Sequence, residues 1–270
     1  MDLFFFKTAL AAYFISTVGY VASLLVKRVT IAKISMWVFL GAFLVQALSF
    51  GARCVETGQS PIRSLYDALS LIAWVMTGGY LAFQLKTRTR ILGAFVSPVA
   101  FLLMIIASIK FGDHVSIPSA LQGNLVPLHV VLAISGEALF ALASCAGAMY
   151  LVQDRLIKTK KGHSFSRLLP SLRDLDRISY LCLLGGFPLL TLGVLVGSIW
   201  ARTAWGSNWQ WDPKQIWTLL AWLLYALLLH QRLARGWRGH KAAWFSILAF
   251  LFLLFCVVVS RFSTTLHSFI

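Results

Sequence analysis

The chain has 270 residues, of which 59% are hydrophobic and 12% are charged, and its formal net charge is +15. This composition excludes a soluble globular domain and is typical of an integral membrane protein. A nucleic-acid partner is not expected, because the basic residues lie in loops between apolar segments. Membrane topology and attraction to anionic lipid explain such an excess.

Eight apolar runs are long enough to span a bilayer, which takes roughly 20 helical residues. The first run is too long, and lacks the small-residue cleavage site, for a removed signal peptide, so we expect a retained span. The sequence therefore predicts an all-α integral membrane protein with eight transmembrane helices in a single domain, residues 1–270. The runs lie near residues 4–26, 34–52, 65–85, 91–109, 127–152, 177–200, 214–231 and 242–262.

The basic residues predict the orientation. The loops after the first, third, fifth and seventh runs hold three, three, seven and four of them, which is 17 of the 24 in the chain. Basic loops stay in the cytoplasm, so both termini are expected on the extracytoplasmic side. The expected location is the inner (cytoplasmic) membrane of a cell, or the thylakoid membrane if the chain comes from a plastid.

Cysteine usage argues against one class of function. The four cysteines are scattered, and no Cys-x-x-Cys pair occurs. The chain is therefore not expected to carry thiol–disulfide exchange or a covalently attached heme.

Three features stand out before the last third of the chain. Asp67 begins the third run, where the helix dipole favours an acid; the alternative is that Asp67 lines an outer chamber. Glu137 lies about two turns inside the fifth run and is expected to face the bundle interior. Gly193 and Gly197 have the spacing of closely packed membrane helices.

Residues 200–217 are rich in tryptophan and follow the sixth run. Tryptophan favours the membrane–water boundary, so an interfacial belt is one interpretation. A belt does not explain the polar insert Asp212-Pro213, which is a helix-start signal. We expect a helix from there to His230, preceded by an aromatic shelf on the outer membrane surface.

This stretch resembles the WWD domain of the heme-handling membrane proteins of cytochrome c biogenesis. The pattern W-G-x-x-W-x-W-D-P-K-x-x-W runs from Trp205 to Trp217 and is most similar to the CcsA (ResC) family. The resemblance implies that residues 200–217 present heme b. The implied heme-contacting residues are Trp205, Trp209, Trp211, Asp212 and Trp217, with Arg202, Lys214 and Arg261 as outer cations for the propionates.

The six histidines separate by position. His163 and His240 lie in basic loops and His114 in an outer loop, so these three are expected to be solvated. His230 is 17 residues beyond Pro213, roughly 25 Å deeper along a helix. The resemblance implies that His129 and His267 are the two axial ligands of an outer heme. It also implies that His230 ligates an inner heme whose second ligand comes from a partner.

The resemblance implies a function in system II cytochrome c synthesis, as a subunit of the synthetase (heme lyase). Heme would cross the membrane and meet an apocytochrome c carrying Cys-x-x-Cys-His, with a CcsB/ResB-like membrane protein as partner. The chain would supply heme ligands and no catalytic nucleophile. Two alternatives remain: a HemX-like heme-binding regulator or accessory of tetrapyrrole biosynthesis, and a transporter without cofactor.

Overall fold

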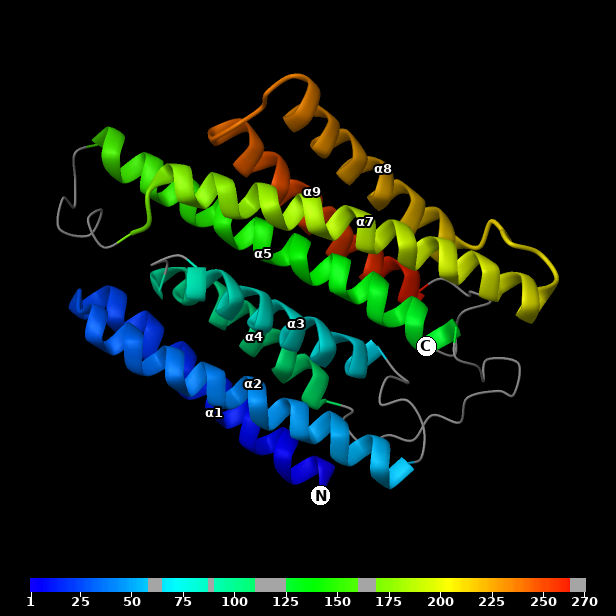
Figure 1. Cartoon of the computed structure of the whole chain (residues 1–270), viewed down its shortest axis with the longest axis horizontal. Coiled ribbons are helices and arrows are strands. Elements are labelled where there is room, and N and C mark those ends of the chain that lie inside the picture. Colours follow the sequence, from blue (N-terminus) through cyan, green and yellow to red (C-terminus); the bar gives the residue numbers. More distant parts are fainter. Residues whose placement is uncertain (58–64, 87–89, 110–124, 160–168, 263–270) are drawn as a thin grey trace.

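The structure is a computed structural model that describes residues 1–57, 65–86, 90–109, 125–159 and 169–262. Within these ranges the chain is helical, and eight α-helices confirm the eight predicted runs (Figure 1). In chain order they are α1 (Asp2–Val26), α2 (Val29–Thr57), α3 (Leu65–Lys86), α4 (Gly93–Ser108), α5 (Leu125–Thr159), α7 (Leu172–Trp205), α8 (Pro213–Ala234) and α9 (His240–Phe262), with a short 3-10 helix η1 (Arg90–Leu92) before α4.

Five of the helices in the described part of the chain, α1, α2, α5, α7 and α8, are long and apolar enough to cross a membrane. The apolar stretches in α4 and α9 are shorter. The helices extend beyond several of the predicted runs: α2 spans Val29–Thr57, α5 continues to Thr159, and α7 spans Leu172–Trp205. Local side-chain bonds support the extensions at the end of α5 and at the start of α7. Lys158 pairs with Asp154 at 2.7 Å, and Ser171 caps α7 by accepting the Asp174 N–H at 3.1 Å.

The helices form two groups, α1 to α4 and α5 to α9, which meet where α3 and α4 lie against α5 (Figure 1). The seam between α5 and α7 is closely packed because glycine lets the backbones touch. A Cβ at Gly136 would stand 2.8 Å from the Gly186 carbonyl oxygen, and one at Gly193 would stand 2.8 Å from the Ala133 nitrogen. The predicted close packing at Gly193 is therefore confirmed.

Buried polar side chains join the first three helices. The Tyr13 hydroxyl donates to the Gln46 side-chain oxygen at 2.6 Å, and the Gln46 amide donates to the Ser70 carbonyl at 2.9 Å. Asp67 lies in the first turn of α3, as predicted, and makes a buried ion pair with Arg53 of α2. The sequence did not indicate this pair, whose members are 14 residues apart.

Candidate functional site

The start of α5, the end of α7 and the start of α8 lie at the same end of the bundle (Figure 1). The expected aromatic shelf is only partly present there. Helix α7 continues through Trp205, so the non-helical connection is shortened to residues 206–212. Gly206 ends the helix with φ 78° and donates its N–H to the Arg202 carbonyl at 2.9 Å. Trp200 and Trp205 of the predicted shelf are helical and pack edge-to-face, with ring centroids 4.9 Å apart.

The predicted helix start at Asp212-Pro213 is confirmed. The Asp212 carboxylate is buried and accepts the Lys214 N–H at 2.8 Å, and Pro213 occupies the first turn of α8. The residue before the cap, Trp211, has φ 54°, a left-handed conformation that costs an L residue roughly 1 kcal/mol. The Gln215 side chain steadies this turn by accepting the Gln210 N–H at 2.8 Å.

His129, near the start of α5, is held by α7. Its Nδ1 lies 2.7 Å from the Gly193 carbonyl oxygen, and Gly197 leaves room for the ring, because a Cβ at Gly197 would stand 2.6 Å from Nδ1. A carbonyl only accepts, so Nδ1 carries the proton and donates it. Nε2 then keeps its lone pair. This is the arrangement of a metal-ligating histidine whose other ring nitrogen is anchored to a carbonyl.

A small cavity of about 80 Å³ opens beside His129. Trp209 from the 206–212 connection borders it, and the buried Trp209 indole N–H has no acceptor in the described part of the chain. Lys214 lines the same cavity and interacts electrostatically with both His129 and Glu137, which is partly buried. The remaining lining residues are Val194, Gly197, Ser198, Trp200, Asn208, Gln215 and Thr218.

The structure brings together only some of the predicted site residues. His129, Trp209 and Lys214 line the cavity. Trp217 instead packs edge-to-face against Phe252 and Phe255 of α9, with centroids 6.3 and 5.8 Å away. Arg202 and Trp211 are exposed, Trp205 lies at the end of α7, and Asp212 serves as the cap. His267, His114, His163 and the Arg261 side chain lie outside the residues that the structure describes.

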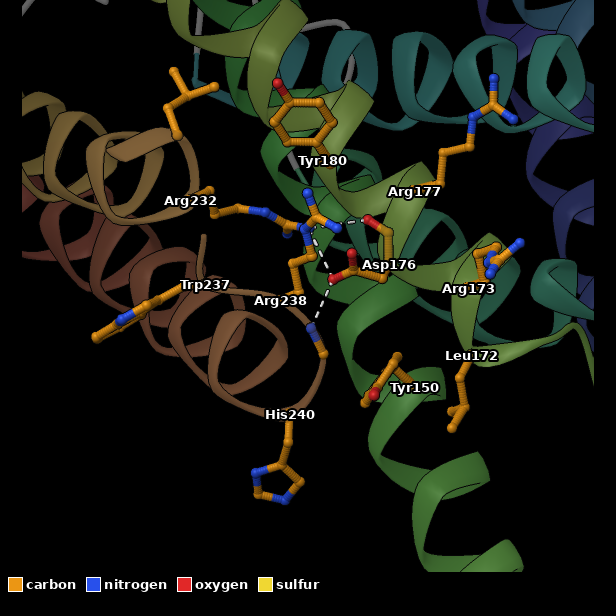
Figure 2. Close-up of a pocket in the computed structure, with 12 residues that line it drawn as sticks. Tyr150, Leu172, Arg173, Asp176, Arg177, Tyr180, Arg232, Trp237, Arg238 and His240 are labelled. Carbon is orange, nitrogen blue, oxygen red and sulfur yellow. Dashed lines mark hydrogen bonds and ion pairs between the residues drawn. The ribbon is translucent and has the colours of Figure 1, made fainter. Parts of the chain in front are cut away.

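His230 lies in the last two turns of α8, at the opposite end from Pro213, and it is exposed. Arg232, two positions on, is buried and points toward α7, where it binds Asp176 at 2.8 Å. Two positions correspond to about 200° around a helix, so the two side chains leave α8 in nearly opposite directions. His240 starts α9 and borders a second cavity at this end (Figure 2).

Sequence reasoning missed the groups that hold His129. Neither the Gly193 carbonyl nor the space at Gly197 was connected with that histidine. A signal was present, since the two glycines are four apart and therefore share one face of α7. Across the whole described part of the chain, no group of three or more His, Cys, Asp or Glu side chains gathers as a metal site.

Comparison with known proteins decides the family. The model of the family described as "Cytochrome C assembly protein" matches residues 62–267, more than half of the chain. The chain belongs to this family. The CcsA cytochrome c biogenesis protein of Chlamydomonas reinhardtii is 35% identical over 260 residues, covering 92% of this chain and 71% of that protein. The CcsA protein of Microcystis aeruginosa is 32% identical, covering 84% of each chain.

The matched region of this cytochrome c assembly protein runs from just before α3 to beyond the end of α9. It therefore contains the cavity beside His129, the 206–212 connection and His230. The family, together with five helices long and apolar enough to span a bilayer, makes the chain a multi-pass membrane protein.

Proposed function

We propose that this protein carries heme across the membrane and presents it, on the extracytoplasmic side, to apocytochrome c for thioether attachment. A CcsB/ResB-like membrane protein is its partner in this proposal. Membership of the cytochrome c assembly family and the similarity to proteins named CcsA support this role over a HemX-like regulator. The charge distribution over the loops supports the orientation.

The observation that carries the proposal is the anchored imidazole of His129. Its Nδ1–H is bound to the Gly193 carbonyl at 2.7 Å, which leaves Nε2 as the iron ligand. His267 supplies the second axial position in the proposal, since bis-histidine ligation needs one imidazole on each side of the ring.

The cavity fits part of a heme. Sites that enclose a small molecule usually have about 300–1,000 Å³, so about 80 Å³ accommodates only the edge of the macrocycle. The unpartnered Trp209 N–H and the Lys214 ammonium are donors suited to a propionate. The rest of the ring would then lie outside the cavity, accessible to an incoming apocytochrome.

His230 is the inner ligand in this proposal. It is exposed on α8, and an imidazole on a membrane-facing surface is costly unless something covers it. A partner helix that brings the second axial ligand would cover it. The chemistry at the outer site needs no nucleophile from this chain. Each cysteine thiol of the apocytochrome adds across a heme vinyl group, so that sulfur bonds to one vinyl carbon and the hydrogen ends on the other.

The test compares His129→Ala, His267→Ala and the double variant, each co-expressed with the partner and a reporter cytochrome c. Each single change is expected to abolish covalent heme attachment, and the double variant should be no worse, because two ligands of one iron act as a unit. Added imidazole should restore part of the activity of each single variant by filling the vacant axial position. His163→Ala, in a basic loop, is the matched control. Defects that simply add, or a dependence on only one histidine, would contradict the bis-histidine site.

A further inference from the structure

The second cavity, of about 680 Å³, lies at the other end of the bundle from His129, where α5, α7, α8 and α9 meet (Figure 2). Four arginines and one aspartate border it, which leaves a formal excess of three positive charges. Two tyrosines and one tryptophan also line its wall. These residues are Arg173, Arg177, Arg232, Arg238, Asp176, Tyr150, Tyr180 and Trp237.

One ion pair builds the frame of this cavity. Arg232 is buried, with its side chain 3% exposed, and it donates to the Asp176 carboxylate at 2.8 Å and to the Asp176 carbonyl at 3.2 Å. The same carboxylate oxygen accepts the Gly239 N–H at 3.0 Å. Asp176, the only acid among the described residues that line the cavity, therefore already holds α7, α8 and the connection before α9 together.

Among the residues that the structure describes, the other three arginines have no such partner. Arg238 stands beside Arg232, while Arg173 and Arg177, one turn apart on α7, extend on the far side of Asp176 (Figure 2). None of the three makes an ion pair with a residue that the structure describes. Like charges held around a cavity of this size repel one another, and an anionic ligand would relieve the repulsion.

The rim of the cavity is ordered. Gly239 has φ 64° and approaches Tyr150 so closely that a Cβ would stand 2.6 Å from the Tyr150 hydroxyl. The backbone N–H of Trp237 donates to the Gln231 carbonyl at 3.1 Å, and the Trp237 ring packs edge-to-face on Phe245. A guanidinium-lined cavity with a fixed rim is suited to phosphate, whose oxygens accept paired N–H bonds from arginine.

Apolar surface borders the cavity and continues from it along α7. Leu233 of α8 lines it and is 59% exposed. Leu184 lies one turn beyond Tyr180 on the same face of α7 and is 41% exposed. Tyrosine and tryptophan mark the membrane–water boundary. A ligand with a phosphate at one end and hydrocarbon at the other matches this arrangement better than a free phosphate does.

We propose that this basic cavity, bordered by Arg173, Arg177 and Arg238, is a binding site for the phosphate headgroup of an anionic phospholipid, whose acyl chains run along α7 against Leu184. The proposal does not depend on the proposed heme function. His230 leaves α8 in nearly the opposite direction from Arg232, so the two sites are separate.

The test titrates the purified, heme-loaded protein with phosphatidylglycerol or phosphatidylcholine and counts bound lipids by native mass spectrometry. The changed variant is Arg173→Gln/Arg238→Gln, which leaves the Arg232–Asp176 frame intact. Its matched control is Arg155→Gln/Arg235→Gln, which removes the same charge from exposed arginines at the same end that do not line the cavity. Glycerol 3-phosphate, which has the headgroup phosphate without acyl chains, is titrated in parallel.

Wild-type protein and the control are expected to hold one phosphatidylglycerol in preference to phosphatidylcholine, and the cavity variant should bind it at least tenfold more weakly. Heme content should stay unchanged in all three. An equal loss of phosphatidylglycerol binding in the control would show that surface charge in general causes the binding, and this result would overturn the site. Equally tight binding of glycerol 3-phosphate would overturn the lipid assignment, and a parallel loss of heme from the cavity variant would assign the cavity to heme instead.

Discussion

Adding one methyl group at Gly197 provides a direct test of the anchored imidazole. The Cβ of Gly197→Ala would stand 2.6 Å from Nδ1 and 2.7 Å from Cε1 of His129. Moving α7 away from α5 would relieve this clash only by separating the closely packed backbones of Gly193, one turn earlier, and Ala133. The ring must therefore turn and give up its bond to the Gly193 carbonyl.

Overpacking of this kind costs about 1–3 kcal/mol. At about 1.4 kcal/mol for each factor of ten, affinity for heme at the outer site should fall roughly 5- to 150-fold. The measurement is Soret absorbance per mole of purified protein, together with the yield of covalently heme-stained cytochrome c. The double variant His129→Ala/Gly197→Ala should match His129→Ala alone, since the methyl group then meets no ring.

Gly185→Ala is the control on the same helix. Its Cβ would stand 3.4 Å from a methyl of Leu139, which is ordinary van der Waals contact, so heme content should remain at the wild-type level. Full heme retention by Gly197→Ala would refute the reasoning, because His129 would then work without the anchor. Equal losses from both glycine variants would point to general damage of the α5–α7 seam.

Three further predictions concern other parts of the chain. His230→Ala should lower the heme content at both proposed sites, and added imidazole should restore part of it. A variant that purifies with the wild-type heme content would show that His230 is not needed for binding. Reporters fused after Ile270 and within residues 206–212 should both report an extracytoplasmic location, and a cytoplasmic signal from either would reverse the orientation. Arg53→Ala should lower the free energy of unfolding by about 3–5 kcal/mol, because the buried Asp67 carboxylate loses its ion pair with Arg53; denaturant titration in detergent measures this, and Arg53→Met/Asp67→Leu should be much less damaging.

The number of helices could be predicted from the sequence because an apolar run of membrane length is a local signal. The cap at Asp212 was equally local, since it depends on adjacent residues. The ends of α5 and α7 were not predicted, because polar residues such as Asp154 and Lys158 continue a helix beyond its apolar part through local pairing.

The site was only partly predictable. His129 and Lys214 were identified from their positions and from the family pattern, and both line the cavity. Trp217 satisfies the same pattern but packs against α9, because a motif specifies spacing along the chain and not the face that each side chain takes. The Gly193 carbonyl could not be assigned to His129, since the contact joins residues 64 apart on different helices.

The glycine seam between α5 and α7 also limits the path that cargo can take. At Gly136 and Gly193 even a methyl group would stand less than 3 Å from the opposite backbone, so nothing as wide as a porphyrin can pass between these helices. In the proposed function, heme moving from His230 toward His129 therefore takes another path, and the exposed position of His230 favours one along the outside of the bundle. His230 is exposed on α8. A heme path at that surface would be bounded on one side by this chain and on the other side by its partner. Transport would then require two proteins for a geometric reason, because neither wall alone encloses the heme.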